Sequence, residues 1–210
     1  MNRIAYILGA TLCAAVTAHA ADTIEVFGHQ WTVFNKADWK VTQEDGSAVL
    51  HLVTPREPLP GPRRPIQFAV VNTPDFDKVR VTADVKPLKR SLIIVFAYRD
   101  AAHFDYAHLS TDTATKQPVH NGVFHVYGGE RVRISSPEGP AAFPQSGRWY
   151  HAELHWDGKT GAVEVSVDGK NIPALHAVDL SLRSGRVGLG SFNETADFKN
   201  VSIEGTQRSQ

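Results

Sequence analysis

Apolar and polar residues alternate along most of the chain after the first twenty positions. In segment 79–85, apolar side chains occupy every second position, and Arg80, Thr82 and Asp84 lie between them. This period of two is typical of a β-strand with one buried face. Segment 91–99, SLIIVFAYR, is apolar almost throughout, which favours a central strand covered on both faces.

The same pattern predicts further strands at FDYAHLS, GVFHVYG, ERVRIS, RWYHAELHWD, AVEVSVDG, GRVGLGSF and DFKNVSIEG. Tight-turn signals accompany several of them, namely Asp157-Gly158, Asp168-Gly169 and Gly128-Gly129. No window after the first twenty residues has a helical period. About ten short strands separated by Gly and Pro predict an all-β, antiparallel two-sheet β-sandwich. We expect a single such domain over residues 21–210.

The first twenty residues have a different pattern. Arg3 precedes an apolar run from Ile4 to Val16, and small residues flank His19. This is the pattern of a secretory signal peptide, and we expect cleavage after Ala20. The run is shorter than the roughly 20 apolar residues that span a bilayer. We therefore expect a periplasmic or extracellular protein with no membrane contact after cleavage. Lipoprotein processing at Cys13 is the alternative, but Leu12 stands where a small residue is required.

Charge and cysteine content exclude several classes of function. The chain has 22 Lys and Arg and 22 Asp and Glu, so its formal net charge is zero. A nucleic-acid or anionic-membrane partner would need a basic excess, and neither is expected. Cys13 is the only cysteine. The mature protein therefore contains no disulfide and no thiolate nucleophile or ligand, and its stability must come from the core.

A proline-rich segment, REPLPGPRRP at residues 56–65, interrupts the strands. Closely spaced prolines stiffen a loop in an extended form, and a rigid loop positions functional side chains well. The segment equally fits a long crossover between strands with no other role.

The catalytic motifs that are easiest to see are missing. There is no Gly-rich phosphate loop, G-x-S-x-G, H-E-x-x-H or E-x-D-x-x-E. Glycosidic hydrolysis by two carboxylates therefore has no visible machinery. Instead, polar and aromatic side chains gather on successive predicted strands, which are usually neighbours in space. They are Tyr98, Arg99, Tyr106, His108, His120, Asn121, His125, Arg131 and Arg133.

These residue types suit proton transfer near a carbonyl group. In HFDYAHLSTD, residues 103–112, the side chains of Phe104, Tyr106, His108 and Ser110 emerge on one face of a strand. Imidazole and phenol move protons, while Arg and Asn hold an oxygen on which charge develops. The set favours elimination from a sugar acid or an oxidised sugar. It also suits plain sugar binding, and Tyr106 alone is an ordinary occupant of a strand.

Other candidates have simpler explanations. His125, His151 and His155 alternate with apolar residues and are expected on solvent faces. Arg131 and Arg133 equally fit an edge-strand charge pair that opposes aggregation. Asp197 is a candidate ligand for a structural calcium ion, held with an N-terminal loop, and a turn-forming Asp is the alternative. We expect Trp149, Trp156 and Phe192 in the core, and His29, His51 and His176 show no metal-ligand spacing.

Five blocks of the chain also resemble a known group. They are REPLPGPRRPIQFAVVN, VFAYRDAAHFDYAHLSTD, HNGVFHVYGGERVRIS, GRWYHAELHWDGKTGAVEVSVDG and GRVGLGSFNETADFKNVSIEG. In this order they resemble secreted bacterial proteins with a concanavalin A-like or laminin-G-like jelly roll, in particular the 3-keto-disaccharide hydrolase or family-16-like group. The resemblance covers about residues 25–205. It implies a curved sandwich whose concave face handles carbohydrate, with site residues Arg64, Tyr106, His108, His120 and Asn121.

Three hypotheses follow for the function. The first is a carbohydrate-active enzyme on a poly- or oligosaccharide. His108 or His120 would be its base and Tyr106 its acid, and Arg64 and Asn121 would stabilise negative charge. Arg99, Tyr98 and Arg131 would help to bind the saccharide. The second is a non-catalytic carbohydrate-binding module that uses Tyr98, Tyr106 and Tyr127. The third is a laminin-G-like domain that binds protein through an exposed apolar patch.

Overall fold

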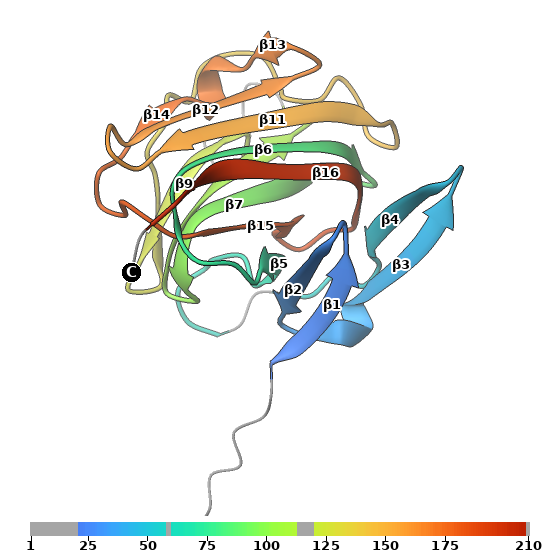
Figure 1. Ribbon diagram of the computed structural model, residues 1–210. Helices are drawn as coiled ribbons and strands as arrows, with labels where there is room; N and C mark the ends of the chain where they lie inside the picture. The colour runs from blue at the N-terminus through green and yellow to red at the C-terminus, as the bar shows by residue number, and fades with distance from the viewer. Residues whose placement is uncertain (1–20, 58–59, 113–119, 209–210) are drawn as a thin grey trace, which may run out of the picture.

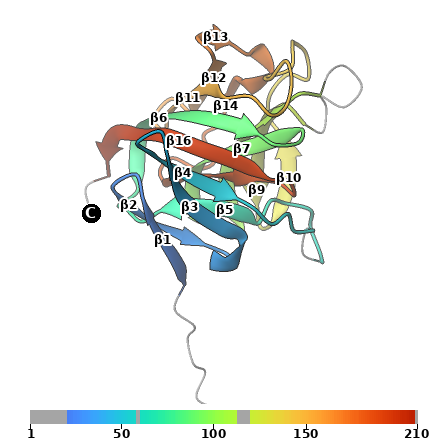
Figure 2. The same ribbon diagram turned by 90° about the vertical axis from the view of Figure 1, so that its right-hand side faces the viewer.

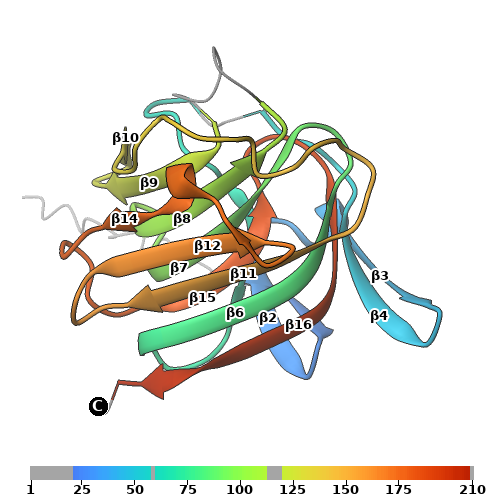
Figure 3. The same ribbon diagram turned by 90° about the horizontal axis from the view of Figure 1, so that it is seen from above.

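The protein is an antiparallel two-sheet sandwich, as the alternating pattern predicts. The computed structural model describes residues 21–57, 60–112 and 120–208. Within these ranges two sheets stack face to face (Figures 1 and 3). The predicted signal peptide, residues 1–20, lies outside the described residues. In the described part, no helix is long and apolar enough to cross a membrane.

The first sheet, here called sheet A, places chain segments far apart in sequence side by side. In the described residues its strand order is β1, β2, β5, β15, β7, β8, β9, β10, and every neighbouring pair is antiparallel. The strands are β1 (Asp22–Val26), β2 (His29–Val33), β5 (Gln67–Val71), β15 (Arg186–Ser191), β7 (Ser91–Asp100), β8 (His103–Ser110), β9 (Gly122–Tyr127) and β10 (Glu130–Arg133).

The second sheet, sheet B, covers the inner face of sheet A. Its order in the described residues is β13, β12, β11, β6, β16, β4, β3, and β14 pairs with β12. These strands are β13 (Lys170–Asn171), β12 (Ala162–Val167), β11 (Tyr150–Asp157), β6 (Phe76–Pro87), β16 (Ala196–Gln207), β4 (Ser47–Leu52), β3 (Trp39–Glu44) and β14 (Ala177–Val178). The described residues also contain two single-turn 3₁₀ helices, η1 (Lys36–Asp38) and η2 (Pro173–Leu175).

The main core lies between the two sheets. Alternate residues of β11 are buried, as expected for a strand with one solvent face. The ring of Trp156 on β11 meets Phe96 on β7 with centroids 5.9 Å apart, so aromatic packing joins the two sheets. The core position expected for Trp156 is confirmed. Trp149 is only half-buried, and the ammonium groups of Lys86 and Lys199 lie over its ring.

Sheet A is apolar on its outer face as well. Residues Ser91 to Ala97 of β7 are all buried, which confirms the prediction of a strand covered on both faces. Ala97 has a positive φ of 49°, and the pairing register of β7 shifts there, so the strand contains a bulge. The second apolar cluster comprises Phe68, Val70, Ile93, Val95, Phe104, Tyr106, Phe124 and Val126, with Tyr98 packed against it.

The proline-rich loop helps to cover this outer cluster. It leaves sheet B after β4 and joins sheet A at β5, so it is a crossover, and it reaches toward the β9–β10 edge (Figure 2). Arg56 anchors its start through two bonds to the buried carboxylate of Asp38, of 2.5 and 2.7 Å. The Arg64 Nε donates to the carbonyl oxygen of Ala101 at 2.9 Å. Pro58 lies outside the described residues.

Candidate functional site

A small polar pocket lies on the outer face of sheet A, where β7 begins and β8 ends. Its volume is about 80 Å³. We call it the arginine–histidine pocket. It brings together residues from the proline-rich loop, from β7, β8 and β10, from the positions just before β7 and β9, and from the segment after β15. Its lining is Arg63, Arg90, Ser91, His108, His120, Arg131, Phe192, Asn193 and Glu194.

His108 is the most unusual group in this pocket. It shares a face of β8 with Phe104 and Tyr106, as predicted, and only 1% of the residue is exposed. Both ring nitrogens are buried, and neither has a hydrogen-bond partner in the described residues. Burial, assisted by the charges of neighbouring cations, holds the pKa of His108 well below its ordinary value, so the ring is neutral. Unpaired buried nitrogens are costly, which makes this ring a candidate for a ligand contact.

His120 faces His108 and has a carboxylate behind it. The two imidazole centroids are 5.2 Å apart in an edge-on arrangement. The Nδ1 of His120 lies 2.6 Å from the Oδ2 of Asp112, and Asp112 is only slightly exposed. This bond assigns the proton to Nδ1 and leaves the Nε2 lone pair for another partner. A carboxylate–imidazole pair of this kind can accept a proton from a bound molecule.

Aromatic rings hold the arginines of the pocket in place. The Arg131 guanidinium carbon lies 5.0 Å from the ring centroids of both Phe124 and Phe192. The guanidinium carbon of Arg63 lies 5.2 Å from the Phe192 centroid. Phe192 is buried, as expected, but it packs on the outer face of sheet A, where it stacks on His108 with an interplanar angle of 11°. The rings orient the cations without neutralising them.

Glu194 forms the opposite wall. Its carboxylate accepts hydrogen bonds from the Arg90 side chain, from the Arg90 and Ser91 backbone amides, and from the Ser91 hydroxyl. The Nε of Arg90 lies 3.0 Å from Oε1 of Glu194. The pair joins the start of β7 to the end of β15 and cancels the charge of Arg90.

Tyr106 and Asn121 lie beside the pocket and do not line it. The Tyr106 hydroxyl accepts a bond from Arg131 at 3.2 Å, and burial raises the pKa of this phenol further above its already high value. Asn121 is fully buried; its side chain accepts from the Ala142 amide and donates to the carbonyl of Pro140. In the described structure both residues therefore position their neighbours.

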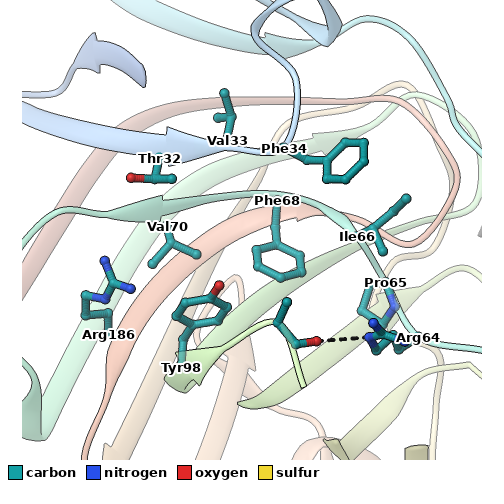
Figure 4. A pocket seen from close by; sticks show the side chains of 11 residues that line it. Thr32, Val33, Phe34, Arg64, Pro65, Ile66, Phe68, Val70, Tyr98 and Arg186 are labelled. Atoms are coloured by element: carbon teal, nitrogen blue, oxygen red, sulfur yellow. Dashed lines mark hydrogen bonds between the residues drawn. The ribbon is translucent and has the colours of Figure 1, made fainter. Parts of the chain in front are cut away.

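The other predicted contacts lie elsewhere. Arg64 and Tyr98 line a second, mainly apolar hollow of about 190 Å³, together with Phe34, Phe68 and Arg186 (Figure 4). Burial raises the pKa of Tyr98. The neighbouring loop residues Arg63 and Arg64 thus serve two different hollows. Arg99 contacts Ser184 and lies 3.7 Å from an oxygen of Asp75.

Asp197 does not have the surroundings of a calcium ligand. One carboxylate oxygen lies 2.8 Å from the Nδ1 of His51, and the other lies 2.6 Å from the ammonium of Lys86. A cation would have to displace both groups. Asp197 lies on β16 and not in a turn, so the turn-forming alternative is wrong, and the calcium ion stays a prediction. His51, for which no partner was expected, is its main neighbour.

His125 was expected on a solvent face, and this is wrong. It points between the sheets and is 9% exposed. Its Nδ1 lies 2.6 Å from Asp105 on β8 and 3.0 Å from Asp179, which follows β14. Burial raises the pKa of Asp105 to about 6, and the bond to Asp105 raises the pKa of His125. In the described residues, these three side chains are the group whose spacing could hold a metal ion.

The sequence pattern does not identify several residues of the pocket. Asp112 and Glu194 look like ordinary turn residues. In the proline-rich loop, the resemblance implies Arg64 as a site residue and does not point to its neighbour Arg63. The signal for Asp112 was its place at the end of HFDYAHLSTD, close in sequence to the predicted His120. Glu194 follows β15, which lies between β5 and β7 in sheet A but comes far later in the chain, so only the tertiary structure brings it to Arg90.

Comparisons with known proteins show the fold. No family model and no curated protein matches the chain. Among solved structures, it is similar to carbohydrate-binding module CBM66 from Bacillus subtilis, with 16% identity, a TM-score of 0.58, and coverage of 83% of this chain and 94% of that one. It is also similar to a protein from Parabacteroides distasonis assigned as a glycosyl hydrolase, with 15% identity, a TM-score of 0.54, and coverage of 82% and 92%.

A third likeness is to part of a larger protein. The GH43 protein BlXynB from Bacillus licheniformis is 12% identical, with a TM-score of 0.53, and the match covers 90% of this chain but 38% of that one. The resemblance to the 3-keto-disaccharide hydrolase group stays a prediction, because no family match tests it. What these likenesses establish is the jelly-roll sandwich itself.

Proposed function

We propose that the protein is an exported carbohydrate-active enzyme that binds a poly- or oligosaccharide across the arginine–histidine pocket and transfers a proton there. The observation that carries this proposal is the fully buried, unpartnered imidazole of His108 beside the paired imidazole of His120. Proteins with the same fold include a carbohydrate-binding module and glycosidase-related proteins, which supports a saccharide as the ligand. Export rests on the predicted signal peptide.

The geometry supports His120 as the base. Its Nε2 takes a proton from a carbon beside a carbonyl or carboxylate of the sugar, as in a uronic acid or a 3-keto sugar. The electron pair forms a carbon–carbon double bond while the glycosidic C–O bond breaks, and the leaving oxygen takes a proton from water. Arg131 stabilises the charge that develops on the carbonyl oxygen. Tyr106, buried and hydrogen-bonded to Arg131, holds this guanidinium and is a poorer candidate for the acid.

Two substitutions at the dyad test this role. The protein is incubated with polyuronates and 3-keto glycosides, and unsaturated product or released sugar is measured. His120→Gln should lower kcat by at least about 100-fold, because general-base catalysis contributes roughly that much. Asp112→Asn should lower kcat about tenfold or more through loss of ring orientation, with little change in KM.

The exposed pair His151–Asp84 on sheet B supplies the matched control. Its Nδ1–Oδ1 distance is 2.9 Å, close to that of the dyad, but it lies far from the pocket in the fold. His151→Gln and Asp84→Asn should leave kcat unchanged. Full activity in His120→Gln would remove the base assignment.

A non-catalytic carbohydrate-binding module is the second candidate. The small volume of the pocket and the similarity to a carbohydrate-binding module favour it. Of its predicted tyrosines, Tyr106 is fully buried, whereas Tyr127 is 60% exposed and packs against His103 and His125. Glycan retention without turnover in the wild type, abolished by Tyr127→Ala and kept by His120→Gln, would establish this function. The laminin-G-like hypothesis predicts protein binding without any saccharide binding.

A further inference from the structure

The arginine–histidine pocket contains more arginine side chains than carboxylates that pair with them. Arg90 is paired with Glu194, and Asp112 is bonded to His120. In the described residues, the ion pairs of this pocket are Arg90–Glu194 and His120–Asp112, so neither Arg63 nor Arg131 has a carboxylate within ion-pair distance. The guanidinium carbons of Arg63 and Arg131 lie 5.2 and 5.0 Å from the centroid of the Phe192 ring. Two guanidiniums held at one ring, with no counter-charge, form a receptor for an anion.

The buried imidazole adds a second requirement for the ligand. A neutral imidazole has one N–H donor and one lone-pair acceptor. Both nitrogens of His108 are buried and without a partner in the described residues, which is costly unless a ligand bonds to them. The two nitrogens point to nearly opposite sides of the ring, so a ligand in the pocket meets one of them, and an acceptor oxygen there would accept a hydrogen bond from the imidazole N–H.

The size of the pocket limits what can enter. Its volume of about 80 Å³ is that of two or three water molecules at about 30 Å³ each. One compact substituent of a sugar fits this space, whereas a whole pyranose ring does not. The remainder of the saccharide must lie outside the pocket, along the outer face of sheet A.

We infer that the pocket receives the carboxylate of a uronic acid residue, with Arg63 and Arg131 binding its oxygens and one N–H of His108 donating to the same carboxylate. The protein therefore selects acidic saccharides over neutral ones. The neutral saccharides that it disfavours include 3-keto sugars. This inference rests on the proposed function and names its substrate class. It also explains why a chain with zero net charge places unpaired guanidiniums in one hollow.

Calorimetric titration of the purified protein tests the selection. The probes are trimers of galacturonate, mannuronate, guluronate and glucuronate, each beside its methyl ester, which keeps the sugar and removes the charge. Sulfated galactose trimers and a 3-keto glycoside complete the set. At least one uronate should bind about tenfold or more tightly than its ester, because bonds to charged groups contribute that much.

Arg63→Gln is the decisive variant because Arg63 is exposed and its loss leaves the core intact. It should weaken uronate binding about tenfold and leave ester binding unchanged. Arg148→Gln makes the same charge change at another exposed position and should alter neither. Arg131→Gln should act like Arg63→Gln, with circular dichroism confirming that the fold is kept.

The outcomes distinguish a failure of the inferred uronate selection from a failure of the proposed function. Equal affinity for a uronate and its ester, or a preference for sulfate esters over carboxylates, overturns the carboxylate assignment. If a 3-keto glycoside is turned over and no uronate binds, the proposed function stands and the inference fails. If a neutral sugar is bound without turnover and no uronate binds, the inference and the proposed catalytic function both fail. If no saccharide of the set binds, both fail.

Discussion

At the scale of single residues, several polar side chains that looked functional in sequence support the pocket from behind. Asn121 is the clearest case. It has a positive φ of 42°, and its amide bonds to the backbone at Ala142, Pro140 and Ser110. Asn tolerates this backbone region better than most residues. The residue therefore fixes the chain next to His120 without reaching the pocket.

Asn121→Ala should reduce the free energy of unfolding by about 3 kcal/mol, because buried backbone groups lose their partners. Urea unfolding measures the change. Asn200 is the matched control, since it also has a positive φ, of 50°, but its side chain is exposed and bonds to Asp84. Asn200→Ala should cost less than about 1 kcal/mol. Equal losses for the two variants would show that Asn121 has no special structural role.

At the scale of elements, the proline-rich loop decides where Arg63 lies. The loop begins at Arg56, which Asp38 and Gln67 hold, since the backbone amide of Arg56 donates to the side-chain oxygen of Gln67 at 2.6 Å. It is held again at Arg64 through Ala101. Between these points the prolines restrict the backbone. The conformational entropy of the loop at Arg63 is therefore largely lost during folding, and little of it is lost when a ligand binds.

Asp38→Asn should loosen this anchor, because Asp38 is buried and is the ionic partner of Arg56. Trypsin should then cleave between Arg63 and Arg64 several-fold faster, and uronate binding should weaken. Asp75→Asn serves as the control, since it removes the partner of Arg99 at a distance of 3.7 Å elsewhere on the surface. Unchanged cleavage in Asp38→Asn would mean that the prolines alone fix the loop.

At the scale of the whole molecule, one buried ionic group joins the two sheets. Asp105 and His125 belong to sheet A, and Asp179 follows β14 of sheet B. Burial raises the pKa of Asp105 to about 6, so its contribution to stability is complete below about pH 4 and is lost as the pH rises through 6. The raised pKa of His125 acts in the same direction at higher pH.

The melting temperature of the wild type should therefore fall between pH 5 and pH 8, by roughly 5 °C, and that of Asp105→Asn should fall less. Carboxylates with lowered pKa values do not affect this change in melting temperature between pH 5 and pH 8. Arg80 holds the pKa of Glu153 at about 2, so its contribution is lost only in stronger acid. Asp84→Asn, at an exposed Asp–His pair, should behave like the wild type. A wild-type melting temperature that rises over this range would contradict the assignment.

The sequence by itself determined the all-β sandwich, because the period of two and the turn residues are local properties of the chain. It also placed His108 and Tyr106 on one strand face, and His120 close to them, because these residues are near in sequence. Only the tertiary structure decided that Tyr106 and Asn121 stand behind the pocket, that His125 faces inward, and that Arg63 lines the pocket while Arg64 does not. Arg63, Arg131 and Glu194 come from a loop, an edge strand and a distant segment. The strand order of sheet A and the path of the loop bring these residues together. No local sequence pattern encodes the strand order or the loop path.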